Sequence, residues 1–251
     1  MRQNPRGRCI IINNVNFDGP LEDREGSELD ADCMKTLFTQ LHFNVTVASN
    51  LTRDEMKELL RRVSKAESHR FADCLVVILM SHGEEGFIYG SDSEKLRLQH
   101  DVYGPFNNEE CPTLQGKPKI FLVQACRGGE WDSGTHDVRI RTDSPNVPDG
   151  NCTVTFEPTR NRIPVLSDMY IAYATIPGYI ALRNRAMGSW FLSAVTKVFS
   201  EHACSTSLDG LMHRVHKMVM ECRTLDGSKQ TPSVNKNGWT KEFYFNPGYF
   251  V

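Results

Sequence analysis

The feature that most constrains this chain is a short apolar run that ends at a single cysteine. Residues 119–129 read KIFLVQACRGG, and apolar residues of this kind fill strands that are buried on both faces. A second run, CLVVILMSHG at residues 74–83, ends in the same way at His82 and Gly83. Because the carboxyl ends of parallel strands meet at one edge of a sheet, we predict that Cys126 and His82 lie together there. A thiol beside an imidazole is a nucleophile with its base, which favours a cysteine hydrolase.

The rest of the chain alternates between strand patterns and helix patterns. The predicted strands are Arg8–Asn13, Phe43–Ala48, Cys74–Met80, Ile120–Gln124, Met169–Thr175 and Glu242–Phe245. Helical spacing lies between them, with one apolar face expected at Leu29, Cys33, Leu37 and Leu41, and with further helices at 56–63, 190–198 and 208–219. Thr52 and Glu55 form a capping box ahead of the second helix. This alternation predicts an α/β fold, with a six-stranded, mostly parallel sheet flanked by helices on both faces.

The composition is that of an ordinary globular protein. Of 251 residues, 39% are hydrophobic and 24% are charged, which is typical of a folded domain. The formal charge of −2 gives no reason to expect nucleic acid or an anionic membrane as a partner. No apolar run approaches the ~18 to 20 residues of a membrane span, and the first residues lack a signal-peptide pattern. We therefore predict a cytoplasmic protein, and a nuclear location is also compatible with the sequence.

The eight cysteines are predicted to be free, buried thiols. Most of them lie inside apolar strand or helix patterns, and no two form a C-x-x-C motif. Nothing indicates secretion, so disulfides are disfavoured, and the same spacing argues against structural zinc. His213 and His216 lie three residues apart on a predicted helix, but no third metal ligand accompanies them. We predict neither a metal site nor a cofactor.

One long segment interrupts the alternation. Residues 131–162 are polar, rich in Pro, Asp, Asn, Thr and Gly, and without sustained periodicity. Loops of this length inside a compact domain are commonly functional or disordered. This one begins five residues after Cys126. It predicts a larger region at 1–131, a linker at 132–161 and a smaller region at 162–251.

The predicted catalytic residues have a consistent chemistry. A cysteine attacks as its thiolate, which requires a base such as His82 nearby. The backbone N–H of Gly83 and that of Cys126 would hold the negative oxygen that forms on the substrate carbonyl. A buried structural thiol is the alternative for Cys126, but the strand that ends at His82 and Gly83 favours catalysis.

These motifs resemble those of the caspases. QACRGG at residues 124–129 and MSHGEEG at residues 80–86 are similar to the segments that carry the caspase cysteine and histidine. The resemblance extends over nearly the whole chain, with further similar segments at 5–14, 23–32, 183–191 and 240–248. It implies a caspase-like fold and a cysteine endopeptidase that cleaves protein substrates after aspartate.

The resemblance also assigns the substrate-binding residues. Arg24, Gln124 and Arg183 correspond to the residues that bind the aspartate carboxylate in caspases. A planar, permanently charged guanidinium suits that carboxylate well. Asn184 and Trp190 correspond to residues near the pocket for the substrate residue three before the aspartate. The resemblance implies no cofactor.

Two features differ from the executioner caspases. In residues 179–182 the aliphatic Ile180 and Leu182 replace the aromatic pair that usually walls the next subsite, and the stretch 222–232 is short for the loop that shapes the outer pocket. Residues 162–169 and 198–215 also resemble initiator caspases that bear a recruitment domain. The role as initiator or executioner, and the preference beyond aspartate, therefore stay open.

The resemblance further implies a zymogen that acts in apoptotic or related proteolysis. The linker offers two processing sites, Asp143 before Ser144 and Asp149 before Gly150, and we favour Asp143. The final segment resembles a dimer-forming strand, so a homodimer through Glu242–Phe245 is expected, along with adaptor or inhibitor proteins as partners. The sheet begins within about ten residues of Met1, which fits either a very short prodomain or a trimmed catalytic domain.

Two other hypotheses compete with this one. A related protease specific for Arg or Lys would need acidic groups in its pocket, and Arg24 and Arg183 argue against it. A pseudo-protease that only binds caspase partners would not need the cysteine, the histidine and the pocket residues together.

Overall fold

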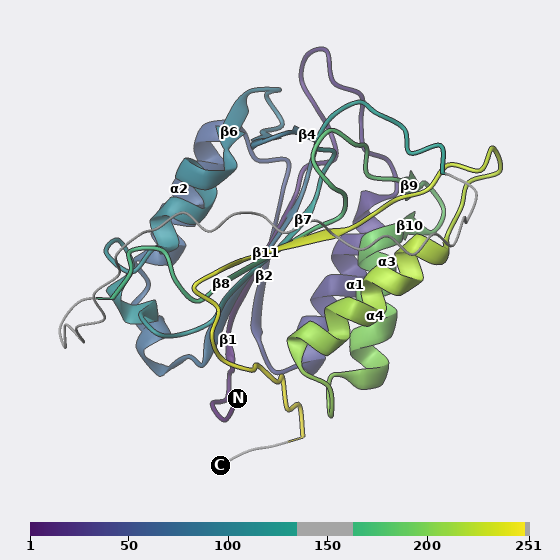
Figure 1. The fold of residues 1–251 in the computed structure, drawn as a ribbon. Coiled ribbons are helices and arrows are strands. Elements are labelled where there is room, and N and C mark those ends of the chain that lie inside the picture. Colours follow the sequence, from purple (N-terminus) through teal and green to yellow (C-terminus); the bar gives the residue numbers. More distant parts are fainter. Residues whose placement is uncertain (135–162, 249–251) are drawn as a thin grey trace, which may run out of the picture.

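A six-stranded sheet forms the centre of the computed structural model, which describes residues 1–134 and 163–248 (Figure 1). Its strands are β1 (Gly7–Asn13), β2 (Asn44–Ser49), β3 (Cys74–Met80), β7 (Lys119–Gln124), β8 (Met169–Tyr173) and β11 (Ser233–Asn237). Their order across the sheet is β11-β8-β7-β3-β1-β2. All neighbours are parallel except β11, which is antiparallel to β8. The predicted six-stranded, mostly parallel sheet is confirmed.

Helices cover both faces of this sheet, as predicted (Figure 1). On one face lie α1 (Ser27–Gln40), α3 (Trp190–His202) and α4 (Leu208–Glu221), and on the other lies α2 (Arg53–Ser64). The alternation of side chains along a strand creates two separate cores. In β1, Cys9 and Ile11 point into the core with α1, α3 and α4. Ile10 and Ile12 point into the core with α2.

The helix predictions were correct in position, but the buried face of α1 differs from the prediction. Thr52 and Glu55 form the expected capping box of α2. In α1, however, Leu29 is 44% exposed and Cys33 is exposed, whereas Met34 and Phe38 are buried. Steps of four residues advance about 40° around a helix, so a run of such steps drifts across the buried face instead of following it.

The predicted strand at Glu242–Phe245 is wrong, because this segment has no strand conformation. Phe243 and Phe245 are both buried in the core that contains α1 and α3, and their rings contact each other. Phe245 contacts Phe38 and Phe199 with ring centroids 6.2 and 5.4 Å apart. The alternation of aromatic residues therefore reflects burial of two rings and not membership of the sheet. The sixth strand is β11, a polar segment of sequence SVNKN.

Smaller elements gather at the end of the sheet where β3 and β7 finish (Figure 1). They are the antiparallel strands β4 (Gly83–Glu84), β5 (Phe87–Tyr89) and β6 (Lys95–Arg97), and the pair β9 (Arg183–Asn184) and β10 (Gly188–Ser189). Short helical turns lie at Glu67–Phe71, Leu98–Tyr103, Gly104–Phe106 and Pro112–Leu114. Within the described residues, no helix has the length and apolar character needed to span a membrane.

The cysteines are less uniformly buried than predicted. Seven of them lie in the described residues, and all seven are free thiols. Cys9, Cys74 and Cys111 are buried, but Cys33 and Cys204 are exposed. Both exposed thiols lie outside the sheet, one on the outer face of α1 and the other beyond the end of α3.

Candidate active site

Strand register brings the predicted cysteine and histidine to one edge. Strands β3 and β7 are parallel neighbours, and Met80 pairs with Gln124 at their carboxyl ends. His82 and Cys126 each follow two residues after this pair. The backbone N–H of Ser81 donates to the carbonyl of Gln124 at 3.3 Å, which extends the alignment beyond the strands. The two side chains therefore start from equivalent positions on adjacent strands.

Gly83 lies against the backbone of the cysteine segment. A Cβ atom at this position would be 2.8 Å from the carbonyl oxygen of Cys126 and 2.9 Å from the Cβ of Ala125. No side chain fits in that space, so only glycine allows the chain after His82 to pass this close. The predicted oxyanion donors, the N–H groups of Gly83 and Cys126, belong to these two adjoining segments.

His82 is held by a backbone carbonyl. Its Nε2 lies 2.7 Å from the carbonyl oxygen of Glu22, and since a carbonyl only accepts, Nε2 carries the hydrogen and Nδ1 keeps its lone pair. The ring of Phe17 packs edge-on at a centroid distance of 4.8 Å. Burial lowers the pKa of His82; the bond to Glu22 opposes this effect, and the charges of Arg24 and Arg183 add to it. The imidazole therefore stays neutral, and able to accept a proton, at a lower pH than an ordinary histidine.

The thiol of Cys126 is half-buried and receives a backbone donor. The N–H of Ala181 lies 3.3 Å from Cys126 Sγ, a contact that would stabilise a thiolate. Among the residues that the structure describes, the thiol and the imidazole of His82 share no hydrogen bond. Without substrate, such catalytic contacts are often long and form only in the complex.

The two predicted pocket arginines are close enough to influence one another. Arg24 is 5% exposed, and its Nη1 donates to the carbonyl of Asn14 at 2.8 Å and to Ser27 Oγ at 3.0 Å. Burial lowers the pKa of Arg24, and the positive charge of Arg183 lowers it further. Arg183 is half-buried, and its Nε and Nη1 have no hydrogen-bond partner among the described residues. The Oε1 atom of Gln124 is buried and likewise finds no partner in the described part of the chain.

Unpaired buried donors of this kind are rare in folded proteins. With the guanidinium of Arg24 nearby, they form a cationic site close to Cys126. In it, Arg24 Nη1 is bonded to Asn14 and Ser27, whereas Arg183 Nε and Nη1 have no acceptor among the described residues. A small anion such as a carboxylate would satisfy them. The roles of Arg24, Gln124 and Arg183 in binding an aspartate carboxylate stay a prediction.

Asp30 places a carboxylate near Arg24 and Arg183, and the sequence motifs did not predict it. It is 3% exposed, and both carboxylate oxygens accept from the backbone N–H of Ser189, at 3.1 and 3.0 Å. A Cβ on Gly188 would be 2.5 Å from Asp30 Oδ1, so the carboxylate fills the space beside that glycine. Burial raises the pKa of Asp30 to about 6, against the opposing effects of Ser189, Arg24 and Arg183.

Asn184 and Trp190 flank a short hairpin. Arg183 pairs with Ser189 across β9 and β10. Asn184 is exposed, and its Oδ1 accepts from the N–H groups of Ala186 and Met187, so it stabilises the turn of the hairpin. The half-buried Trp190 begins α3. Their predicted place near an outer substrate pocket stays a prediction.

Arg127, the residue after the cysteine, lies on an aromatic side chain. Its guanidinium carbon is 4.1 Å from the ring centroid of Tyr173. The hydroxyl of Tyr173 in turn lies 3.0 Å from that of Tyr103. Arg127 Nη1 also donates to the carbonyl of Thr175 and to Ser233 Oγ, at 3.4 and 3.3 Å. This side chain therefore ties the cysteine segment to β8 and β11.

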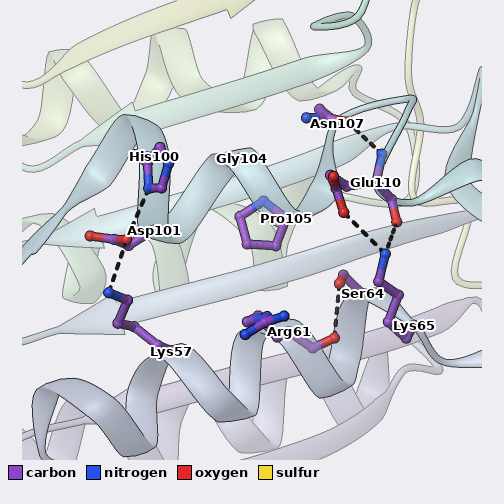
Figure 2. A pocket seen from close by; sticks show the side chains of 10 residues that line it. All are labelled: Lys57, Arg61, Ser64, Lys65, His100, Asp101, Gly104, Pro105, Asn107 and Glu110. Carbon is purple, nitrogen blue, oxygen red and sulfur yellow. Dashed lines mark hydrogen bonds and ion pairs between the residues drawn. The ribbon is translucent and has the colours of Figure 1, made fainter.

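A cavity of ≈ 470 Å³ lies away from this edge, between α2 and residues 98–110 (Figure 2). Lys57 on α2 pairs with Asp101 at 3.3 Å, and Lys65, directly after the end of α2, pairs with Glu110 at 3.2 Å. Arg61 lies between the two pairs. None of the predicted catalytic or pocket residues lines this cavity.

Comparison with known proteins agrees with this geometry. The family model described as "Caspase domain" matches residues 6–244. The chain belongs to the caspase family. It is 38% identical to caspase-7 of Gallus gallus over 248 residues, which cover 95% of this chain and 77% of the relative. It is 37% identical to caspase-3 of Bos taurus over 248 residues, which cover 95% of this chain and 84% of the relative.

A third caspase differs more in length. Caspase-2 of Gallus gallus is 38% identical over 221 residues, which cover 86% of this chain. The chain spans about half the length of that relative, since the match covers 52% of it. The predicted membership of the family of aspartate-specific cysteine endopeptidases is confirmed.

Three residues that support the candidate site are not indicated by the sequence motifs. Glu22 binds His82 through its backbone carbonyl, a group that every residue possesses. Only its position, two residues before Arg24, could have indicated that it lies near the site. Asp30 lies within the segment 23–32 that resembled caspases, but its bond to Ser189 spans 159 positions. Gln230 bonds to residues 48 and 56 positions away, and no local pattern indicates such contacts.

Proposed function

We propose that this caspase cleaves peptide bonds after aspartate through Cys126 and His82, with Arg24, Gln124 and Arg183 holding the aspartate carboxylate. The observation that carries the proposal is the pair of unpartnered donors on Arg183, Nε and Nη1, at the sheet edge that presents Cys126. The aspartate side chain supplies the missing acceptor.

The proposed reaction begins with proton transfer. His82 Nδ1, free because Nε2 is bonded to Glu22, takes the proton from Cys126 Sγ. The thiolate attacks the backbone carbonyl carbon of the aspartate itself, and the N–H groups of Gly83 and Cys126 bind the resulting oxyanion. His82 then gives its proton to the departing amine nitrogen as the peptide bond breaks. Water hydrolyses the thioester that remains, and the thiol is regenerated.

Aspartate specificity follows from the charges around the pocket. Among the described residues, two guanidinium groups share a single buried carboxylate there, that of Asp30, so a substrate carboxylate would complete the charge balance. The carboxylate of Asp30 is already bonded to the backbone of Ser189, so it does not offer an acidic recognition group to a basic substrate. This arrangement supports aspartate over Arg or Lys at the cleavage position.

We also propose that the enzyme is made as a zymogen and acts in apoptotic or related proteolysis. Asp143 is the favoured processing site and Asp149 the second, and both lie outside the described residues. The proposed division is 1–131, a linker at 132–161, and 162–251. Strand β8, after the linker, pairs with β7 from Lys119–Met169 to Val123–Tyr173. Cleavage in the linker would therefore leave both regions joined in one sheet.

We further propose a homodimer in the cytoplasm or nucleus, with adaptor or inhibitor proteins as other partners. Because Glu242–Phe245 is not a strand, we place the proposed dimer contact at the outer edge of β11 instead. In the described part of the chain, β11 pairs with β8 alone, so its other edge has unpaired backbone groups. Such an edge can accept a further strand. Sedimentation of the protein bound to an aspartyl inhibitor would show a dimer, and a monomer there would contradict this proposal.

Matched peptides test the catalytic proposal. We expect kcat/KM for a fluorogenic tetrapeptide ending in aspartate to exceed that for its asparagine counterpart by about 10³-fold or more, because an unpaired charge site rejects the neutral group. A lysine peptide should not be cleaved. Equal rates for aspartate and asparagine would contradict the assignment of Arg24 and Arg183.

A further inference from the structure

Gln230 lies behind the segment that carries the pocket arginine. It is 1% exposed. Its Oε1 accepts from the backbone N–H of Leu182 at 2.6 Å, and its Nε2 donates to the carbonyl of Ala174 at 2.8 Å. Both ends of the amide are therefore used. The side chain bridges the end of β8 to the residue immediately before Arg183.

The backbone of Leu182 is held from two sides. Gln230 binds its N–H, and the backbone N–H of Trp190 donates to its carbonyl at 3.3 Å. The residues on either side of Leu182 in the sequence contribute to the candidate site. Ala181 places its N–H 3.3 Å from Cys126 Sγ, and Arg183 extends two unpaired donors.

Backbone bonds join residues 178–180 to Arg127 and Glu130, and the side chain of Gln230 adds a bond at Leu182, nearer to Arg183. Between β8 and β9, residues 174–182 belong to no strand of the main sheet. Ala174 is fully buried, and its own N–H bonds to the carbonyl of Val123 on β7. Because Gln230 binds both Leu182 and Ala174, it fixes the position of Leu182 relative to the sheet that carries Cys126.

We propose that Gln230 is a positioning residue for substrate binding, which fixes Arg183 relative to Cys126 through the backbone of Leu182. This inference rests on the proposed function of Arg183 and Cys126. Gln230 touches neither the reacting atoms nor the aspartate. Its loss should weaken recognition of the aspartate while the reactivity of the thiol remains.

Two reagents separate these effects. An aspartyl fluoromethylketone needs both the pocket and the thiol, whereas iodoacetamide needs only an accessible thiolate. In Gln230→Met, which keeps the length of the side chain but has no amide, we expect the ratio of the two labelling rates at Cys126 to fall about tenfold or more. We also expect KM for an aspartyl tetrapeptide to rise by more than kcat falls.

Controls distinguish this role from general destabilisation. Gln115→Met removes another glutamine that donates to a backbone carbonyl, that of Asn108 at 2.7 Å, and its ratio should match that of the wild type. If Gln230→Met does not fold, Gln230→Glu replaces it, because a carboxylate oxygen would then oppose the carbonyl of Ala174. A fall in the ratio for the folded variant supports the proposal.

A ratio within about twofold of the wild type in the folded variant would overturn the role of Gln230. An equal loss of both labelling rates would also overturn it, because the effect would then lie on the thiol. If the wild-type protein itself shows no preference for the aspartyl reagent, the proposed function fails instead. The two failures are thus distinguishable.

Discussion

The nucleophile edge and the carboxylate pocket are held in different ways. Cys126 and His82 follow directly from two paired strands, so a continuous backbone ladder sets their separation. Arg24 and Arg183 come from segments 159 positions apart, and side chains such as Asp30 and Gln230 add to the short backbone contacts of these segments. In the proposed site, reactivity and specificity therefore have separate structural supports. Variants should therefore be able to remove one and spare the other.

Cys126→Ala should give the largest effect, on the nucleophile edge alone. We expect hydrolysis of aspartyl peptides to fall by at least about 10⁴-fold, because no other group can form the thioester. Binding of a reversible aspartyl inhibitor, measured by calorimetry, should persist because the pocket is intact. The control is Cys33→Ala, at an exposed thiol on α1, which should keep full activity. Substantial hydrolysis by Cys126→Ala would refute the assignment.

Phe245→Ala tests the segment 242–245, which is not a strand and is held in place by buried side chains. The ring is fully buried against Phe243, with centroids 5.0 Å apart, and against Phe38 and Phe199. Removing it should lower the free energy of unfolding by about 3–5 kcal/mol, as measured by chemical denaturation. Phe71→Ala, at a residue that is 77% exposed, should cost little. Equal stabilities would mean that the segment is not packed as described.

Arg183→Lys should damage the pocket and spare the edge. Lysine lacks the planar fork that a carboxylate engages through two bonds, so kcat/KM for aspartyl peptides should fall by about 10²-fold. Alkylation by iodoacetamide should proceed at the wild-type rate. Arg185→Lys provides the control, because Arg185 is exposed and forms an ion pair with Glu25 at 3.1 Å. Parallel losses of cleavage and alkylation would show that the two regions are not separable.

Asp30→Asn should change how stability depends on pH. Burial raises the pKa of Asp30 from 3.8 to about 6, so between these values the folded protein holds a proton that the unfolded chain has lost. This contribution to stability is present at low pH and disappears as pH rises through about 6. The stability of wild type relative to Asp30→Asn should therefore fall by up to about 3 kcal/mol from pH 4 to pH 7. Asp32→Asn, at an exposed position on the same helix, should show no such trend.

The same division explains what the sequence could predict. Strands β1, β3 and β7 were predictable because they are continuous apolar runs, and their ends located His82 and Cys126. Strand β11 was missed because an edge strand has few buried positions. Glu242–Phe245 was mistaken for a strand because two buried rings alternate with polar residues.

Within the site, the unpredicted contributors act across long sequence separations. The family resemblance located Arg24, Gln124 and Arg183, but it did not indicate what holds them. Asp30 and Gln230 bond to backbone groups of distant segments, and Glu22 contributes a carbonyl that every residue possesses. Such contacts depend on tertiary packing and have no local signature.

The decisive measurement is to identify which thiol reacts with an aspartyl fluoromethylketone, because the proposed pocket should direct this reagent to Cys126. The described residues contain seven free cysteines, and Cys33 and Cys204 are more exposed than Cys126. Accessibility alone would direct the reagent to the exposed thiols, whereas the proposed pocket directs it to the half-buried one. We predict that peptide mass spectrometry will find a single adduct, at Cys126, and none with the asparaginyl analogue at the same concentration. Adducts at Cys33 or Cys204 with Cys126 unmodified would contradict the account.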